Sequence, residues 1–93
     1  MREFRFSKAY EQDIKHLSQG LYRNVISKDL KFVISMLAAD KPLDKRYFDH
    51  KLQGDWVGYR ECHIKPDLIL IYAKPDDSTL TLVRIGTHSE LFS

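Results

Sequence analysis

Three strand-like segments in the C-terminal half constrain the fold more than any other feature of the chain. They cover residues 56–64, 68–74 and 79–85, and the middle one begins with the apolar run LILIY. Only short connections separate them, Lys65-Pro66-Asp67 and residues 75–78, and both are rich in turn-forming residues. Strands joined by connections of hairpin length pair in antiparallel order. The sequence therefore predicts an antiparallel sheet at the centre of the fold.

The N-terminal half adds one strand and two helices to this sheet. Residues 2–6 alternate between two sets of side chains and predict a short strand, and Ser7 is placed to cap a helix that ends near Gly20. A second helix begins near residue 21 or near Ser27, which is either its N-cap or an interior residue, and ends at residue 39.

The remaining stretch, residues 40–55, is charged, contains Pro42 and Gly54, and is predicted to be a loop. The predicted order is β-α-α-β-β-β. This is an α+β fold with two helices packed on one face of a small antiparallel sheet, and with the other face largely open.

Length and composition limit what such a chain can be. With 93 residues, it is expected to form one domain over residues 1–93. A net charge of +2 permits a nucleic-acid partner but does not by itself indicate one. The one cysteine, Cys62, excludes a disulfide framework, and neither a membrane-spanning run nor a signal peptide is visible. We expect a cytoplasmic protein with no membrane contact.

Ionisable residues are unusually dense in the stretch GYRECHIKPD, residues 58–67. Strand alternation places Glu61 and His63 on one face, with Val57 and Tyr59. The opposite, core-like set runs from Trp56 to Ile64 and includes Arg60 and Cys62. Arg60 does not suit a core, so it is predicted to form an ion pair or to keep its head exposed.

Three histidines lie where elements of the sheet begin or end: His50 before it, His63 near a strand end and His88 after the last strand. Whether they converge is left open by the sequence. Arg84 shares a face with Leu80 and Leu82 by alternation, but its position near the strand end could still bring its guanidinium to the open surface. A structural explanation exists for each candidate: surface exposure for the histidines, an ion pair for Glu61, a turn for Asp67 and core packing for Phe92.

Metal binding is a further alternative, since His, Asp and Glu are suitable ligands. Neither an HExxH motif nor a cysteine-based spacing is present, so we expect no metal and no cofactor. Cys62 belongs to the core-like set and is not expected to act as a nucleophile.

Several spaced motifs resemble one known family. They are His50-x-Leu52-x-Gly54-x-Trp56-x-Gly58-Tyr59-Arg60-x-x-His63-Ile64-x-Pro66-Asp67, Leu70-Ile71-Tyr72, and Arg84-x-Gly86-Thr87-His88-x-x-Leu91-Phe92. This set resembles the YafQ family, toxins of bacterial type II toxin–antitoxin systems in the RelE/ParE superfamily. The match is dense over residues 48–92, and the N-terminal part agrees mainly in the order of its elements. The resemblance implies a RelE-like fold.

The resemblance also implies an activity and partners. Family members are ribosome-dependent mRNA endoribonucleases that enter the ribosomal A site and cut the message, and a cognate antitoxin neutralises them. The toxin–antitoxin complex is expected to be hetero-oligomeric and to bind its operator through the antitoxin. By position, the functional residues of the family fall on His50, Glu61, His63, Asp67, Arg84, His88 and Phe92.

The chemistry of RNA cleavage suits this set of residues. RNA supplies its own nucleophile, the 2′-OH, so a metal-independent enzyme needs a base, an acid and a cation for the phosphate. We expect His88 to be the acid, and either His63 or Asp67 acting with His50 to be the base. Glu61 is expected to set a histidine's tautomer or pKa through a shared hydrogen bond, and Arg84 to meet phosphate oxygens.

Two features supplement this set. Phe92 offers a face for base stacking. Lys51, Lys65 and Arg60 are expected either to contact phosphates of mRNA or rRNA, or to be ordinary solvated side chains.

Two other functions stay open. One is a ParE-like toxin that binds DNA gyrase without nuclease activity. The other is an inactive, regulatory relative that acts through an antitoxin on an operator.

Overall fold

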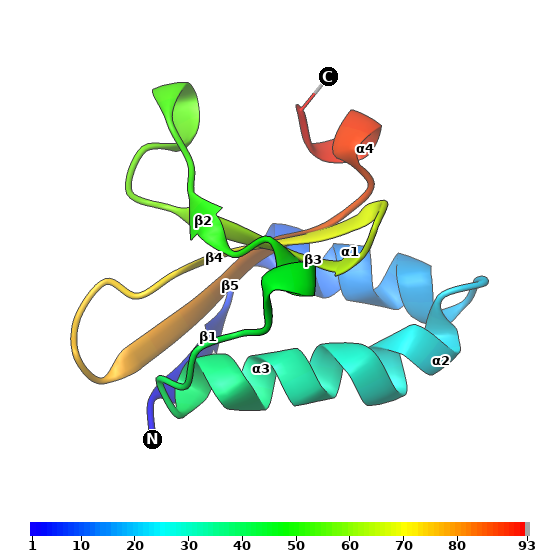
Figure 1. The fold of residues 1–93 in the computed structure, drawn as a ribbon. Helices are drawn as coiled ribbons and strands as arrows, with labels where there is room; N and C mark the ends of the chain where they lie inside the picture. The colour runs from blue at the N-terminus through cyan, green and yellow to red at the C-terminus, as the bar shows by residue number, and fades with distance from the viewer. Residues whose placement is uncertain (93) are drawn as a thin grey trace.

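The protein, described here over residues 1–92 of a computed structural model, forms one five-stranded sheet with its two long helical segments on one face (Figure 1). The strand order is β1-β5-β4-β3-β2. The strands are β1 (Glu3–Phe6), β2 (His50–Lys51), β3 (Arg60–Lys65), β4 (Leu68–Ala73) and β5 (Thr79–Gly86). The predicted hairpins β3–β4 and β4–β5 are both present and antiparallel.

The expectation of a purely antiparallel sheet is wrong at one edge. β1 runs parallel to β5, with Glu3 opposite Thr79 and Phe6 opposite Leu82. Side-chain alternation reports which face a residue occupies but carries no information on strand direction. The sheet is therefore mixed, and the two hairpins form its antiparallel part.

The helices begin close to their predicted starts. α1 (Lys8–Ser18) is capped by Ser7, whose Oγ accepts a hydrogen bond of 2.9 Å from the N–H of Tyr10. The second helical segment is continuous but not uniform. It consists of α2 (Arg23–Val25), the π-helical turn η1 (Ile26–Leu30) and α3 (Lys31–Ala38). Ser27 is interior to this segment and donates to the carbonyl of Asn24, so it is not the N-cap.

The main core lies between these helices and the sheet. Buried residues of α1, η1 and α3 meet those of the central strands, and the largest group comes from β4 and β5: Leu68, Leu70, Tyr72, Leu80, Leu82 and Ile85. Cys62 and Ile64 of β3 belong to the same cluster, as strand alternation predicts. The helix-facing side of the three central strands is therefore used for packing.

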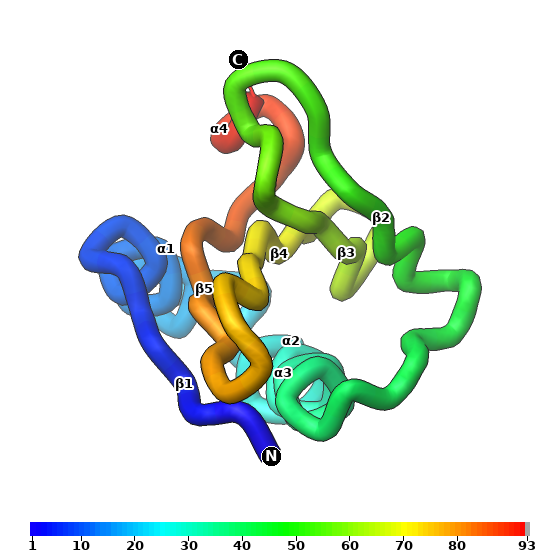
Figure 2. The backbone as a smooth tube through the Cα atoms, turned by 90° about the vertical axis from the view of Figure 1, so that its left-hand side faces the viewer, coloured from blue at the N-terminus to red at the C-terminus, as the bar shows by residue number. Residues whose placement is uncertain are grey.

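The opposite face is less open than expected. Residues predicted as a loop contain η2 (Lys45–Tyr47), β2 and η3 (Gly54–Trp56), and the C-terminal tail contains a fourth helix, α4 (His88–Phe92). Figure 2 shows α4 and the loop after β2 on the side of the sheet away from α3. They cover Ile69 and Ile71 in a second small cluster, which explains why β4 is buried on both faces.

Within residues 1–92, no helix combines the length and apolar character needed to cross a membrane.

Candidate active site

One row of residues crosses four strands on the less covered face of the sheet. Strand pairing sets His50 opposite Glu61, Glu61 opposite Ile71, and Ile71 opposite Arg84. Residues directly opposite one another in antiparallel strands share a face of the sheet. The fold therefore aligns an imidazole, a carboxylate and a guanidinium in one line, with an apolar floor between them.

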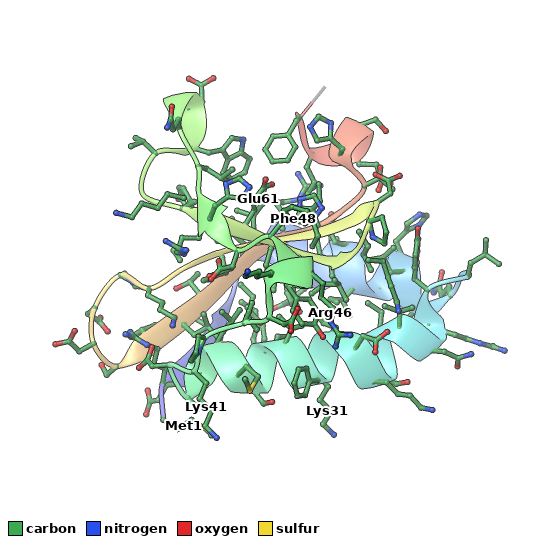
Figure 3. The ribbon with its side chains drawn as sticks, in the orientation of Figure 1. Met1, Lys31, Lys41, Arg46, Phe48 and Glu61 are labelled. Atoms are coloured by element: carbon green, nitrogen blue, oxygen red, sulfur yellow. The ribbon has the colours of Figure 1, made fainter. Side chains whose placement is uncertain are left out.

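Glu61 lies at the centre of a histidine–carboxylate cluster. Its Oε1 is 2.8 Å from Nε2 of His50 and 3.8 Å from Nε2 of His63. Figure 3 shows Glu61 rising from the sheet between β2 and α4. Glu61 is 8% exposed, and its Oε2 is buried without a hydrogen-bond partner among the described residues. A buried carboxylate oxygen that lacks a partner is explained by a bound water or ion, by strain or by a catalytic role.

The two histidines of this cluster differ in how their nitrogens are used. Nδ1 of His50 lies 3.1 Å from the carbonyl oxygen of Lys51, and Nε2 faces Glu61. Both nitrogens of His50 thus face oxygen atoms that can accept a hydrogen bond. His63 has a longer contact with Glu61 and is half-buried. Glu61 therefore constrains the ring of His63 less than the ring of His50.

The same three side chains could also hold a metal ion. One ligand atom from each of His50, Glu61 and His63 lies within 4.8 Å of the others. Two imidazole nitrogens and a carboxylate oxygen suit Zn²⁺ or Cu²⁺. No metal-binding motif in the sequence pointed to this arrangement, because the three ligands come from two neighbouring strands and meet only in the folded sheet.

His88 is positioned by the short helix α4. Thr87 and Glu90 form a capping box: the Thr87 N–H donates to Oε1 of Glu90 at 2.8 Å, and the Glu90 N–H donates to Oγ1 of Thr87 at 3.3 Å. Oδ1 of Asp67 accepts from the His88 N–H at 3.3 Å. Asp67 thus joins the β3–β4 turn to α4 beside His88. The pattern Thr-x-x-Glu at residues 87–90 is the sequence signal that would have predicted this helix.

Phe92 is the last residue of α4 and packs against two other rings. Its ring centroid lies 5.1 Å from that of His88 and 6.2 Å from that of Trp56. Trp56 packs with Ile69 and Ile71 in the second cluster, so its assignment to the core-like set is wrong. The reason is that β3 begins only at Arg60, after a 3₁₀ turn and Gly58 at φ 92°, so alternation does not extend back to residue 56.

Alternation predicted that Arg84 shares the face of Leu80 and Leu82. The structure places Arg84 on the opposite face. The pairing shifts between Ile71 and Tyr72, so Val83 is an extra residue in β5 and Arg84 moves to the face of Ile71. Its Nε and Nη2 lie 2.7 and 3.1 Å from the carboxylate of Asp13 in α1. The hydrogen bond to this carboxylate raises the pKa of Arg84, which stays charged.

Asp13 is a residue that sequence reasoning missed. It is 71 positions from Arg84, and no local pattern links the two. Its Oδ2 also accepts from the N–H of Ile85 at 3.1 Å, so it occupies the edge of β5 beyond the end of β1. Asp13 therefore binds both the backbone at the edge of β5 and the guanidinium of Arg84.

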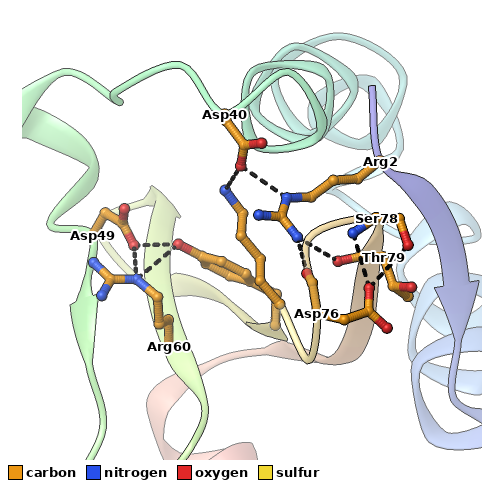
Figure 4. Close-up of polar contacts among 9 residues, drawn as sticks. Arg2, Asp40, Asp49, Arg60, Asp76, Ser78 and Thr79 are labelled. Carbon is orange, nitrogen blue, oxygen red and sulfur yellow. Dashed lines mark hydrogen bonds and ion pairs between the residues drawn. The ribbon is translucent and has the colours of Figure 1, made fainter.

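Arg60 points to the other face and is used in a structural contact. Its Nε lies 3.3 Å from Oδ1 of Asp49 and 3.2 Å from the hydroxyl of Tyr72, which also donates to Asp49 (Figure 4). This is the ion pair that its place in the core-like set predicted. Among the lysines, Lys65 pairs with Asp29 at 2.9 Å and Lys51 is exposed on β2.

The structure thus gathers the candidates into two groups on one face. His50, Glu61 and His63 form the first group, and Asp67, His88 and Phe92 form the second. Arg84 ends the row at β5, while Arg60 lies on the far face.

Comparison with known proteins places this site in a family. Residues 2–93 match the family described as the bacterial toxin of type II toxin–antitoxin systems, YafQ. The chain is 41% identical over 92 residues to the mRNA interferase toxin YafQ of Escherichia coli K12, covering 98% of this chain and 96% of the relative.

Solved structures agree with this match over nearly the whole chain. The toxin of the E. coli DinJ–YafQ complex superposes with a TM-score of 0.85 at 36% identity and covers 100% of both chains. A copper-bound toxin mutant from Helicobacter pylori gives a TM-score of 0.86 at 41% identity, covering 99% of this chain and 100% of the other. The chain therefore belongs to the YafQ family of bacterial type II toxin–antitoxin toxins.

Proposed function

We propose that this protein is a toxin of a type II toxin–antitoxin system and an mRNA endoribonuclease that cuts messages on the ribosome, with residues 1–93 forming a single toxin domain. The observation that carries the proposal is the row from His50 through Glu61 to Arg84, with His63 against Glu61 and with His88 exposed at the start of α4. This arrangement offers a base, an acid and a permanent cation on one exposed face. The name of the E. coli relative, an mRNA interferase toxin, supports the same activity.

The base side of the reaction belongs to the histidine–carboxylate cluster. We assign proton removal from the 2′-OH to His63, because both ring nitrogens of His50 already face oxygen acceptors. Glu61 holds the two rings in place and balances the charge that His63 gains. His50 then acts as a positioning residue for Glu61.

The acid side belongs to α4. His88 lies at the start of this helix with its ring exposed, so it can protonate the 5′-oxygen that leaves. Asp67 binds the backbone of His88, and Phe92 offers a stacking face next to the ring. Both residues support the acid without exchanging its proton.

Arg84 completes the site as the cation for the phosphate. Asp13 binds its Nε and Nη2, which leaves Nη1 and the outer proton of Nη2 for phosphate oxygens. Charge that develops on the phosphate in the transition state is stabilised most by a donor that is already oriented. Asp13 supplies that orientation.

A cognate antitoxin is the expected protein partner. The E. coli relative was solved in complex with DinJ. We propose a hetero-oligomeric complex that binds its operator through the antitoxin, and a cytoplasmic location, where the ribosomes are.

A direct experiment separates this function from a gyrase-binding toxin. The protein is induced in bacteria, and incorporation of labelled methionine and of labelled thymidine is followed in parallel. A nuclease that acts on the ribosome stops protein synthesis first. If thymidine incorporation stops first while translation continues, the proposed activity is wrong.

Metal binding is a second candidate role for the cluster His50–Glu61–His63, favoured by its geometry and by the copper-bound H. pylori toxin. A bound ion would occupy the nitrogen lone pair with which His63 accepts the proton of the 2′-OH, so we expect it to inhibit cleavage.

Addition of Cu²⁺ should raise the melting temperature of the parent protein, and His50→Gln should remove most of that rise. EDTA-treated protein should cut mRNA at the parental rate, and a loss of cleavage that Zn²⁺ or Cu²⁺ restores would contradict a metal-independent mechanism.

A further inference from the structure

Phe48 is a large apolar side chain that the fold leaves exposed beside the candidate site. It is 64% exposed, and its ring centroid lies 5.7 Å from that of His63. Its backbone is left-handed, with φ 47° and ψ 48°, a conformation that bulky L-residues rarely adopt. Such conformations cluster at functional sites. An exposed ring held in this way is not explained by core packing.

The segment before Phe48 fixes this conformation from one side. Oδ1 of Asp44 accepts from the N–H of Arg46 at 3.0 Å and caps the turn η2. The N–H of Phe48 then donates to the carbonyl of Lys45 at 3.0 Å and closes the turn. These two hydrogen bonds therefore fix the backbone conformation on the N-terminal side of Phe48.

The residue after Phe48 fixes it from the other side. Asp49 accepts hydrogen bonds from the hydroxyl of Tyr72 and from Nε of Arg60, as Figure 4 shows. Tyr72 is 1% exposed in the central strand β4, so this anchor belongs to the sheet itself. Hydrogen bonds thus hold the backbone on both sides of Phe48, and its ring stays exposed.

Phe48 and His63 line the same groove, which has a volume of about 540 Å³. Ligand-binding pockets typically enclose about 300–1,000 Å³, so the groove has room for a nucleotide. Arg46 and Lys65 also line it and bring positive charge, part of which Asp29 offsets through its pair with Lys65. Aromatic rings among cationic side chains are the usual surface for single-stranded nucleic acid.

We propose that Phe48 is a stacking platform for the base of the mRNA nucleotide next to the scissile phosphate. The proposal rests on the proposed ribonuclease function. His63 belongs both to the cluster and to the groove, so a strand whose phosphate lies at His63 continues over Phe48. Arg46 and Lys65 then lie beside the phosphate of that nucleotide. Phe92 serves the other side of the site, near His88.

Single-turnover cleavage on ribosomes carrying a defined mRNA tests this assignment. Rates are measured over a range of toxin concentrations for the parent, Phe48→Leu, Phe48→Trp and the matched control Phe32→Leu. Phe32 is also a half-exposed phenylalanine, on α3 in the opposite layer. Phe48→Leu should lower the cleavage efficiency roughly 10- to 100-fold, as the loss of one base–aromatic stack does. Phe48→Trp should stay near the parental value, and Phe32→Leu should be unchanged.

A second variant separates stacking from a structural role. Asparagine tolerates the left-handed conformation better than phenylalanine, so Phe48→Asn should melt at or above the parental temperature. It also lacks a ring, so its cleavage should fall as far as that of Phe48→Leu. A purely structural role would move stability and cleavage in the same direction.

The proposal is overturned if Phe48→Leu cleaves as well as the parent and Phe32→Leu. It is also overturned if Phe48→Leu leaves cleavage intact but weakens binding of the antitoxin, since Phe48 would then be an antitoxin contact. A parent protein that does not cut mRNA at all would instead refute the proposed function.

Discussion

At the scale of single residues, the site depends on side chains that hold other side chains in place. Glu61 contacts two histidines, and Asp13 holds Arg84 with two hydrogen bonds. A positioned donor stabilises developing charge without reorganisation during the reaction. Removal of a positioning residue should therefore lower activity even where it never touches the RNA.

Asp13→Asn tests this idea. The amide keeps the size of the carboxylate but loses its charge and one acceptor oxygen, so Arg84 is held less firmly. For this partly exposed ion pair we expect a stability loss of about 1 kcal/mol. Cleavage on ribosomes should fall several-fold. Glu11→Gln removes a negative charge from the first turn of the same helix, so it should leave cleavage unchanged and cost less stability than Asp13→Asn. If Asp13→Asn cleaves faster than the parent, Asp13 restrains Arg84 rather than orienting it.

Sequence reasoning reached some of these residues but not others. Alternation in β3 placed Glu61 and His63 on one face correctly, because the strand is regular from residue 60 to residue 63. It failed for Arg84, because an extra residue in β5 reverses the alternation after Leu82. Asp13 and Phe48 carry no local signal. Their roles follow from contacts across the fold and from one unusual backbone conformation.

At the scale of elements, two short segments that were predicted as loop or tail carry residues of the candidate site. β2 brings His50 to Glu61, and α4 places His88 over the end of the sheet. Both are too short for a hydrophobic period to predict. The capping box at Thr87 and Glu90 was a readable signal, since it depends on residue type at a fixed spacing.

Glu90→Ala tests whether the capping box positions the acid. Loss of the Glu90 side chain frees the Thr87 N–H, and loss of a cap costs about 0.5–2 kcal/mol in typical helices. In a helix as short as α4 we expect fraying and a clear fall in cleavage. Glu90→Gln keeps an acceptor at the same place and should restore most of the activity. Parental cleavage by Glu90→Ala would show that His88 does not need the capped helix.

At the scale of the whole molecule, a polar network near the N-terminus joins segments that are far apart in the sequence. Asp40 accepts hydrogen bonds from Lys74 at 2.7 Å and from Arg2 at 2.8 Å, and Arg2 also donates to the backbone carbonyls of Asp76 and Thr79 (Figure 4). These contacts join the end of α3, the segment after β4 and the start of β1. They link the helical layer to the turn between β4 and β5.

This network predicts a pH dependence of stability. The hydrogen bonds from Lys74 and Arg2 lower the pKa of Asp40 below its ordinary value of 3.8. The stabilisation is therefore fully present above that ordinary value and is lost as the pH falls through the lowered pKa. The melting temperature of the parent should exceed that of Asp40→Asn at pH 7, and the difference should shrink as the pH drops below 4. The exposed control Asp55→Asn should show a smaller difference at pH 7. A difference between parent and Asp40→Asn that is the same at pH 7 and pH 3 would contradict the linkage.

The central claim is that one face of the sheet cuts mRNA on the ribosome with His88 as the acid. The most direct measurement maps mRNA 5′ ends after purified protein is added to translating ribosomes, with naked mRNA and the His88→Gln variant in parallel. We predict cuts in phase with codons for the parent on ribosomes, and none on naked mRNA or with His88→Gln. Equal cutting of naked mRNA, or a fully active and folded His88→Gln protein, would contradict the account.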